Sequence, residues 1–325
     1  MPQTLRDALD TVFDLGYIPT EIPDFITTNL NPALPLRPYQ EQALARLFYY
    51  INGYPKRANP AQLLFHMATG SGKTLIMAAA ILYLYQQGYR KFIFFVNSTN
   101  IIEKTRENFL NPLSSKYLFA GRLKFGAQEV HIHEVDNFQT AYDDDIRIMF
   151  TTIQGLHVRL NEPRENSLTY EDFGDNDIVL ISDEAHHINA LTKTKLTKTE
   201  EANLNTWEAT VNRIFTARPG NILLEFTATI ELDHPAVRQK YEDKILYQYW
   251  LKDYRQDGYS KEVKVLQADM PPLERALQAV VLSQYRRKVA EKNGIPLKPV
   301  LLMKSRFIAE SETHEREFRT RMDTL

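Results

Sequence analysis

The chain contains no cysteine, and this absence excludes three kinds of chemistry. Without a thiol there can be no disulfide, no thiolate zinc site and no cysteine nucleophile. Long hydrophobic runs are also missing, since the longest one, after Thr74, is shorter than the roughly 20 residues that span a bilayer. The opening residues include Arg6, Asp7 and Asp10 instead of the apolar core of a signal peptide. We therefore expect a cytoplasmic protein that has no membrane partner.

An excess of charge of either sign is likewise absent. Lys and Arg number 39 and Asp and Glu number 41, which gives a formal net charge of −2. Such a balance creates no global positive field, so any contact with nucleic acid must come from a local groove. Hydrophobic residues make up 43% of the 325 residues, which is enough to bury a sizeable core and predicts about two folding units.

Glycine is scarce, with 12 residues, yet two of them fall in the short segment 65–74, Phe-His-Met-Ala-Thr-Gly-Ser-Gly-Lys-Thr. Because Gly70 and Gly72 lack a Cβ, the backbone can turn tightly and direct successive N–H groups at an anion. An apolar strand candidate precedes the turn and a long apolar helix candidate follows it, so the positive end of the helix adds to the cradle. The segment predicts a phosphate-binding loop, in which ATP would be bound by Thr69, Gly70, Ser71, Gly72, Lys73 and Thr74.

Lys73 and Thr74 carry the side chains that this chemistry requires. The Lys73 ammonium is predicted to reach the β- and γ-phosphates, and the Thr74 hydroxyl to be a ligand of the bridging Mg²⁺. The strict pattern has glycine where Met67 stands, so the match is one residue short. A glycine turn in an ordinary α/β protein is the alternative, and the order of strand, turn and helix favours the phosphate loop.

A second polar pair, Asp183 and Glu184, follows the apolar residues 178–181. A parallel strand that ends there would deliver both carboxylates to the carboxyl edge of the sheet, where such folds bind ligands. We predict that Asp183 holds Mg²⁺ and that Glu184 orients and deprotonates the attacking water. A solvated turn is the alternative for this pair alone. With Lys73 upstream, the predicted catalytic residues are Lys73, Asp183 and Glu184.

Six segments in a fixed order carry a resemblance to a known family. They are residues 36–40, 67–74, 92–98, 151–155, 183–186 and 225–230. Together they resemble the motor core of superfamily 2 DEAD/DEAH-type helicases and translocases, and within that group the Res (restriction) subunit of Type III restriction enzymes. The resemblance implies an α/β fold: a RecA-like P-loop domain whose parallel sheet has helices on both faces, and the beginning of a second RecA-like domain. Alternating strand and helix candidates along the chain favour the same sheet.

The resemblance also implies roles for residues that no local chemistry identifies. Gln40, with Arg37, would bind the adenine end of ATP. Nucleic acid would be contacted by Asn97, Ser98, Thr151, Thr152 and Gln154, where small hydroxyl and amide groups suit phosphate oxygens. Taken singly, the hydroxyl and amide residues at these strand ends have helix N-capping as the alternative. Coupling of hydrolysis to movement would fall to Thr227, Thr229 and His186.

By this resemblance the protein is an ATP-dependent DNA helicase or translocase, the motor of a restriction endonuclease. It would use ATP and Mg²⁺, act on double-stranded DNA and work with a methyltransferase or specificity subunit. Two alternatives stay open: an RNA helicase or nucleic-acid sensor of the same superfamily, and a non-motor ATP-binding scaffold. Residues that hold a phosphate backbone do not by themselves distinguish DNA from RNA.

We predict four regions along the chain. Residues 1–30 form a helical lead-in, 31–232 the ATP-binding motor domain, 233–295 a linker with short strands and a long helix, and 296–325 the truncated start of a second motor domain. The glycine- and arginine-rich motifs that the family has further along are missing from the sequence. We therefore expect an amino-terminal fragment that hydrolyses ATP poorly, with any nuclease domain beyond residue 325. Strands are expected at residues 63–65, 92–96, 130–133, 146–150, 178–181, 222–226, 247–251, 261–266 and 299–306.

Other patterns receive a plainer interpretation. Residues 172–174, Asp-Phe-Gly, are predicted to be a turn because no His-Arg-Asp loop precedes them. His131 and His133 would share a strand face, as metal ligands can, but no third ligand is spaced to join them, and we expect a plain strand. Residues 262–264 are expected to form a surface strand, and the lysine- and threonine-rich residues 190–205 a solvated insertion.

Overall fold

The computed structural model describes residues 3–139, 144–162, 168–184, 198–260, 265, 267 and 269–324. The chain separates into two compact units, Met1–Lys261 and Glu262–Leu325. The first unit is built on a seven-stranded sheet. Within the described residues of the second unit, the regular elements are two helices, α10 (Pro272–Lys292) and α11 (Ile308–Asp323).

The paired strands of the main sheet all run parallel, in the spatial order β5-β6-β2-β7-β8-β1-β9. Central strands of such a sheet are buried on both faces and are therefore apolar along most of their length. The strand β2 is an example, because all six of its residues are buried. The strands are β1 (Ala61–Met67), β2 (Lys91–Val96), β5 (Ile132–Glu134), β6 (Ile146–Thr152), β7 (Ile178–Asp183), β8 (Ile222–Thr227) and β9 (Ile245–Tyr249).

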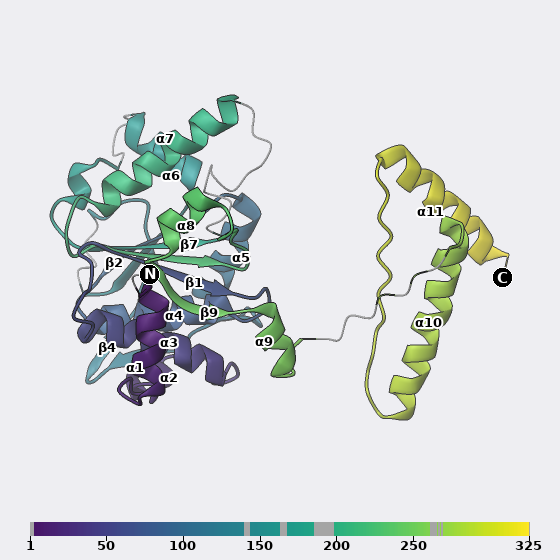
Figure 1. Ribbon diagram of the computed structural model, residues 1–325, viewed down its shortest axis with the longest axis horizontal. Coiled ribbons are helices and arrows are strands. Elements are labelled where there is room, and N and C mark those ends of the chain that lie inside the picture. The colour runs from purple at the N-terminus through teal and green to yellow at the C-terminus, as the bar shows by residue number, and fades with distance from the viewer. Residues whose placement is uncertain are drawn as a thin grey trace. The chain divides into compact units, whose positions relative to one another are not determined.

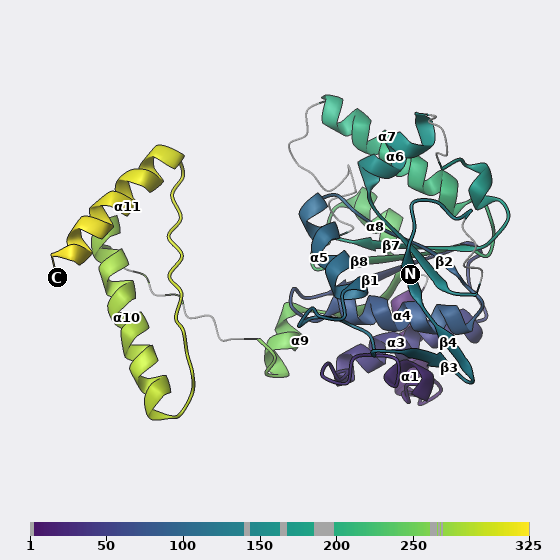
Figure 2. The same cartoon turned by 180° about the vertical axis from the view of Figure 1, so that it is seen from behind.

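Alternate residues of a strand point to opposite faces of the sheet and so pack in two different cores. In β2, Phe92 and Phe94 belong to one core, and Ile93 and Phe95 to the other. Figures 1 and 2 show α3 and α4 on one side of the sheet and α6 and α7 on the other. The first core is packed by α1 (Leu5–Asp14), α2 (Asp24–Thr27), α3 (Pro38–Asn52), α4 (Lys73–Gln86) and α5 (Thr99–Leu110), and the second by α6 (Ile153–Asn161) and α7 (Lys198–Phe215).

The predicted fold class, an α/β domain with a parallel sheet covered on both faces, is confirmed. One predicted strand, at residues 130–133, is wrong in its extent. Residues 123–130 fold back as the antiparallel pair β3 (Leu123–Phe125) and β4 (Gln128–Val130), which turns at Gly126 with a φ of 61°. The chain therefore enters the main sheet only at Ile132, where β5 begins.

The first unit extends past residue 232, since α8 (Pro235–Tyr241), β9 and α9 (Leu251–Gln256) all belong to it. The strand expected at residues 247–251 is found as β9, which pairs with β1 at the edge of the main sheet. The strand expected at residues 299–306 does not form, because the described part of the second unit offers it no partner strand. The long helix predicted before it is confirmed as α10, and α11 follows it. Most of the strand expected at residues 261–266 lies outside the described residues.

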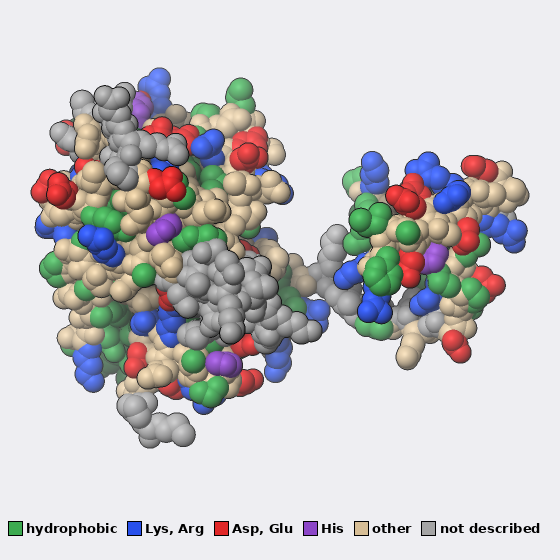
Figure 3. All heavy atoms as spheres, turned by 90° about the horizontal axis from the view of Figure 1, so that it is seen from above, with side chains coloured by type: hydrophobic (Ala, Val, Ile, Leu, Met, Phe, Trp, Pro, Cys, Tyr) green, Lys and Arg blue, Asp and Glu red, His purple; other side chains and the backbone are tan. Residues whose placement is uncertain are grey.

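No helix in the described ranges is long and apolar enough to cross a membrane. On the face of the first unit that Figure 3 shows, Lys and Arg side chains are interspersed with Asp and Glu. This mixture agrees with the net charge of −2 and shows no single-sign field on that face.

Candidate nucleotide-binding site

The predicted site residues converge because the strands that carry them end at one edge of the sheet. Val96 at the end of β2 lies opposite Thr152 at the end of β6, and Asp183 at the end of β7 lies opposite Phe226 in β8. The strand β1, which precedes the glycine turn, pairs with β8 on the other side. In parallel sheets this carboxyl edge is where ligands bind.

The loop between β1 and α4 has the left-handed turns for which glycine is suited. Gly70 has a φ of 83° and Gly72 a φ of 77°, a region in which a side chain would be strained. The helix α4 begins at Lys73, whose side chain is buried and whose Nζ donates to the Met67 carbonyl at 3.3 Å. Thr69 is exposed at the turn. The predicted order of strand, glycine turn and helix is therefore present.

Side chains from outside the loop hold its carbonyl groups. Gln40 Nε2 and Tyr39 Oη both donate to the Ser71 carbonyl, each at 2.8 Å. Tyr254 in α9 donates to the Gly70 carbonyl at 2.9 Å. Carbonyl groups that are held from outside favour an arrangement in which N–H groups of the loop face inward, as an anion requires. Gln40 is buried, and its hydrogen bond to the Ser71 carbonyl holds the loop in place.

Arg37 lies in a cluster of tyrosines that sequence reasoning missed. Its guanidinium donates to Tyr39 Oη at 3.2 Å and to Tyr254 Oη at 3.4 Å, and it lies 4.5 Å from the centre of the Tyr259 ring. Tyr39 also stacks on Tyr249 in β9 with 4.1 Å between ring centres. The one available signal was the density of tyrosine in residues 247–259, and nothing in that local pattern connects it to the distant glycine turn.

Asp183 ends β7, and Glu184 follows it in a left-handed backbone conformation. The φ of Glu184 is 55°, and among the described residues it is the one non-glycine with a positive φ. Such conformations cost about 1–3 kcal/mol and gather at functional sites. The Glu184 N–H donates to Asp183 Oδ1 at 3.0 Å, so the two residues are fixed as a unit.

The electrostatics of Asp183 connect it to the phosphate-loop candidate. Burial raises the pKa of Asp183 to about 6, while the positive charge of Lys73 opposes the rise and the negative charge of Glu184 adds to it. Lys73 and Asp183 therefore interact across β8, the strand that separates β1 from β7. The structure brings these two predicted residues together at one edge.

The residues at this edge suit a triphosphate and Mg²⁺. The Thr74 hydroxyl and the Asp183 carboxylate are hard oxygen ligands, the kind that Mg²⁺ prefers. A Cβ added at Gly72 would lie 2.5 Å from Gln40 Nε2, so only glycine fits the turn without displacing that amide. The buried Ser71 Oγ has no hydrogen-bond partner in the described part of the chain. Buried polar atoms of this kind commonly indicate a ligand, ion or water.

His66 is a further candidate that no motif indicated. It is buried near the end of β1, where its Nδ1 accepts from Gln248 Nε2 at 2.9 Å. Its Nε2 then carries the proton and donates to the Ala228 carbonyl at 3.2 Å, inside the predicted coupling segment. Arg6 donates to the Gln248 oxygen, which fixes the direction of both bonds. His66 thus connects the phosphate-loop strand to residues 227–229.

The His66 ring is expected to make stability depend on pH. Burial lowers its pKa from 6.5 to about 4, although the hydrogen bond to Ala228 opposes this, and the Lys73 charge lowers it further. Between these two pKa values the unfolded chain binds a proton that the folded chain does not. Lowering the pH from 7 to 5 should therefore reduce the free energy of unfolding by about 2 kcal/mol through this ring.

Asp183 titrates in the opposite sense over an overlapping range, because its folded-state pKa is raised. The measurement is therefore a comparison of urea unfolding for the wild type and His66→Gln at both pH values. We expect the free energy of unfolding of the wild type to fall by about 2 kcal/mol more than that of the variant. Parallel pH dependences of the two proteins would contradict the expectation.

The predicted nucleic-acid contacts fall into two groups. Asn97 and Gln154 are exposed. The Thr152 hydroxyl caps α6, where it accepts a backbone N–H of the first turn at 2.9 Å, and Thr151 Oγ1 donates to the Thr152 carbonyl at 3.1 Å. Ser98 occupies the N-cap of α5 without a side-chain capping bond. The N-capping alternative is thus observed for Thr152, and nucleic-acid contact stays a prediction for all five.

The coupling candidates at the end of β8 form a local turn. Thr227 is buried, and its hydroxyl donates to the Thr229 carbonyl at 2.8 Å and accepts the Thr229 N–H at 3.2 Å. Their role in coupling stays a prediction. His186 lies outside the described residues, as do residues 190–197 of the expected insertion.

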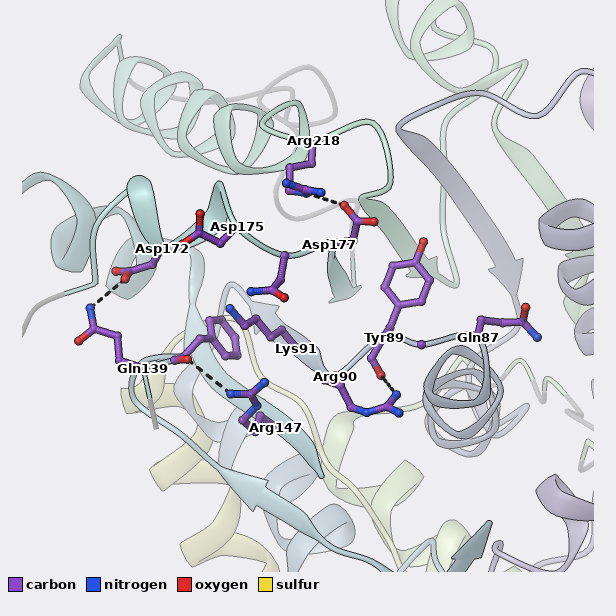
Figure 4. Close-up of a pocket in the computed structure, with 13 residues that line it drawn as sticks. Gln87, Tyr89, Arg90, Lys91, Gln139, Arg147, Asp172, Asp175, Asp177 and Arg218 are labelled. Atoms are coloured by element: carbon purple, nitrogen blue, oxygen red, sulfur yellow. Dashed lines mark hydrogen bonds and ion pairs between the residues drawn. The ribbon is translucent and has the colours of Figure 1, made fainter. Parts of the chain in front are cut away.

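A large cavity of about 770 Å³ lies at the opposite edge of the sheet, around the starts of β2 and β6. Figure 4 shows Arg218 paired to Asp177 at this cavity, while Asp172 accepts from Gln139. The amino and carboxyl ends of parallel strands lie at opposite edges, so this cavity is not the nucleotide site. Residues 171–173 form a short 3₁₀ helix there, which confirms the predicted turn at the Asp-Phe-Gly segment.

The fold and the site together define the class of protein. A glycine turn joins a parallel strand to a helix that begins with a buried lysine, and an acid pair ends a strand two positions away in the sheet. This is the arrangement of a P-loop α/β nucleotide-binding domain.

Comparison with known proteins identifies the family. The model of the family described as Type III restriction enzyme, res subunit, matches residues 33–232, and the chain belongs to this family. The predicted resemblance is confirmed. The chain is also 38% identical over 315 residues to a probable type III restriction-modification enzyme HindVIP Res subunit from Haemophilus influenzae. That match covers 90% of this chain and 60% of the relative, so the chain spans about 60% of the length of the curated relative that it matches.

Solved structures show weaker likenesses. A Sulfolobus solfataricus SWI2/SNF2 ATPase core in complex with double-stranded DNA is 16% identical, with a TM-score of 0.37, over 69% of this chain and 38% of its own. A nuclease-deletion mutant of the Type ISP restriction-modification enzyme LlaGI, in complex with a DNA substrate mimic, is 14% identical, with a TM-score of 0.41, over 78% of this chain and 24% of its own. TM-scores this low carry no conclusion, and the fold assignment stands on the strand order alone.

Proposed function

We propose that the chain is the ATP-hydrolysing motor part of a Type III restriction enzyme and that the complete protein moves on double-stranded DNA. The observation that supports this best is the electrostatic interaction of Lys73 with Asp183 at the edge where the glycine turn lies. An ammonium and a carboxylate at the same edge of the sheet suit the phosphates and the Mg²⁺ of a single nucleotide.

The proposed roles follow from the chemistry of each side chain. Lys73 stabilises negative charge on the phosphates, and Thr74 with Asp183 would hold Mg²⁺, which neutralises phosphate charge when bound. Glu184, oriented by its left-handed backbone, positions the attacking water and accepts its proton. The backbone N–H groups of residues 69–72 cradle the phosphates.

The adenine base is proposed to bind beside Arg37 and Gln40. Aromatic rings and guanidinium planes are surfaces on which bases stack, and Arg37 lies among the rings of Tyr39, Tyr254 and Tyr259. Gln40 has its amide within this neighbourhood, so a ligand that binds here would compete for the bond to the Ser71 carbonyl.

Double-stranded DNA and a methyltransferase or specificity subunit are the proposed partners, and the family supports both. Backbone contacts with DNA are proposed for Asn97, Ser98, Thr151, Thr152 and Gln154. The competing hypotheses are an RNA helicase or nucleic-acid sensor of the same superfamily, and an ATP-binding scaffold that does not move on nucleic acid.

We also propose that residues 31–232 hold the motifs of the first motor domain, with residues 1–30 as a lead-in, and that a second motor domain starts near residue 296. The predicted linker of residues 233–295 is shortened, because the compact unit of the first domain extends to residue 261. In P-loop ATPases an arginine finger contributes roughly 10³–10⁵ to the rate. If a second motor domain supplies that arginine, the chain of 325 residues by itself should bind MgATP weakly and hydrolyse it slowly.

The test uses the chain and the complete enzyme. A fluorescent ATP analogue with Mg²⁺ should bind the wild-type chain, and Lys73→Ala should weaken binding by at least about tenfold, since a charged hydrogen bond is lost. Lys56→Ala, which removes an exposed lysine, is the matched control. In the complete enzyme, duplex DNA should stimulate ATP hydrolysis more than duplex RNA of the same sequence. Equal affinity of the Lys73 variant would refute the phosphate loop, and equal stimulation by RNA would refute the preference for DNA.

A further inference from the structure

We propose that a divalent transition-metal ion of the zinc class binds at the amino-terminal start of β5, held by His131, His133 and Asp145. One potential ligand atom from each residue lies within 4.8 Å of the others. The expectation that no third ligand joins the two histidines is therefore wrong. In the parallel pairing of β5 with β6, Ile132 lies opposite Ile146, so the residues just before them, His131 and Asp145, come side by side.

The ligand atoms are close enough for one ion to reach all three residues after small side-chain movements. His133 Nε2 lies 2.8 Å from Asp145 Oδ2, and His131 Nδ1 lies 3.8 Å from Asp145 Oδ1. Nitrogen and oxygen ligands that bind zinc at 2.0–2.1 Å in a tetrahedron are about 3.3 Å apart, which is between these two values. Two imidazoles and a carboxylate are also a donor set that zinc commonly takes, with a fourth position left for water.

Groups around the three residues orient them for this role. Asp145 Oδ1 accepts the backbone N–H of His131 at 2.9 Å, which fixes the carboxylate against the strand. Burial alone would raise the pKa of Asp145, but the hydrogen bonds from His131 and His133 outweigh it and lower the pKa, so the carboxylate is ionised at neutral pH. On the far side of the ring, His131 Nε2 lies 4.0 Å from Glu129 Oε1. A ligating histidine usually donates its other ring N–H to such a carboxylate, which here requires the two side chains to come closer by roughly 1 Å.

The location separates this site from the predicted Mg²⁺ ligands. His131 and Asp145 precede the starts of β5 and β6, at the amino edge of the sheet, whereas Thr74 and Asp183 lie at the carboxyl edge. The site is open to solvent, since the side chain of His131 is 63% exposed. A bound ion would tie β5, a strand of three residues at the edge of the sheet, to its neighbour.

The experiment is a calorimetric titration with ZnCl₂ of the 325-residue chain, without a histidine tag and after treatment with a chelator. Excess Mg²⁺ is present throughout to occupy oxygen-ligand sites. We expect one zinc ion per chain, and at least about tenfold weaker binding for His131→Gln and for His133→Gln. His234→Gln, which replaces an exposed histidine at the start of α8, should bind as the wild type does. Absence of stoichiometric binding, or equal binding by His131→Gln, would overturn the proposal.

A second measurement removes the concern that a variant has lost its fold. His131 is exposed, so its replacement should leave Tm without metal unchanged. Zinc should raise the Tm of the wild type, because a ligand that binds only the folded state stabilises it. The same rise in His131→Gln would show that zinc acts elsewhere and would also overturn the proposal.

Discussion

Replacing Glu184 by Gln is expected to lower kcat for ATP hydrolysis in the complete enzyme by about 10²–10⁴-fold, the usual contribution of a general base. Affinity for ATP should be retained, because the amide has the same size and Lys73 keeps its position. Glu184 is held at a φ of 55° next to Asp183, a conformation that the replacement does not require to change. Steady-state hydrolysis and binding of a fluorescent ATP analogue measure the two effects separately.

The matched control is Glu242→Gln, which changes an exposed glutamate that follows α8. It should leave both measurements unchanged. If Glu184→Gln hydrolyses ATP at the wild-type rate, then Glu184 is not the base. A complete enzyme that keeps its biological activity although this variant no longer hydrolyses ATP would favour the scaffold hypothesis. Loss of ATP binding instead of turnover would assign the residue to binding.

Replacing Gly72 by Ala is expected to have the largest combined effect on stability and binding. A non-glycine residue at a φ of 77° costs about 1–2 kcal/mol. The new Cβ would also lie 2.5 Å from Gln40 Nε2, and displacing that buried amide breaks its hydrogen bond to the Ser71 carbonyl, for about 1–3 kcal/mol more. Binding of MgATP should weaken at least about tenfold, because the N–H groups of the loop shift with its backbone.

Gly16→Ala separates the two causes. Gly16 has almost the same φ, 76°, but a Cβ added there would have no atom within 4 Å. Urea unfolding should therefore show only the backbone cost for this variant, and MgATP binding should be unchanged. An equal loss of stability in the two variants would show that the contact with Gln40 contributes nothing. Full ATP binding by Gly72→Ala would exclude the glycine turn as the phosphate cradle.

How much the sequence predicted depended on whether the signal was local. The glycine turn, the strand that precedes it and the helix after Gly72 are consecutive, so the pattern was sufficient to find them. The acid pair at the end of β7 was found for the same reason. The strand at residues 130–133 was placed with the wrong extent, because the turn at Gly126 draws Val130 into a separate hairpin.

Contacts between distant segments had no such signal. His66 sits in an apolar strand, and only the pairing of β1 with β8 and β9 reveals that it bridges Gln248 and Ala228. Tyr254 reaches the Gly70 carbonyl from a helix 184 residues away along the chain. The spacing of a single motif does not determine the order of strands in a parallel sheet. The sequence alone therefore could not predict that these distant residues are in contact.

By itself the sequence determined the fold class, the phosphate-loop candidate and the acid pair, because each depends on neighbouring residues and on the period of the strand. The tertiary structure alone decided that Lys73 and Asp183 interact across β8 and that Asp145 joins His131 and His133. The physical reason is that parallel pairing fixes which strand ends become neighbours, and that pairing is settled by packing of the whole sheet.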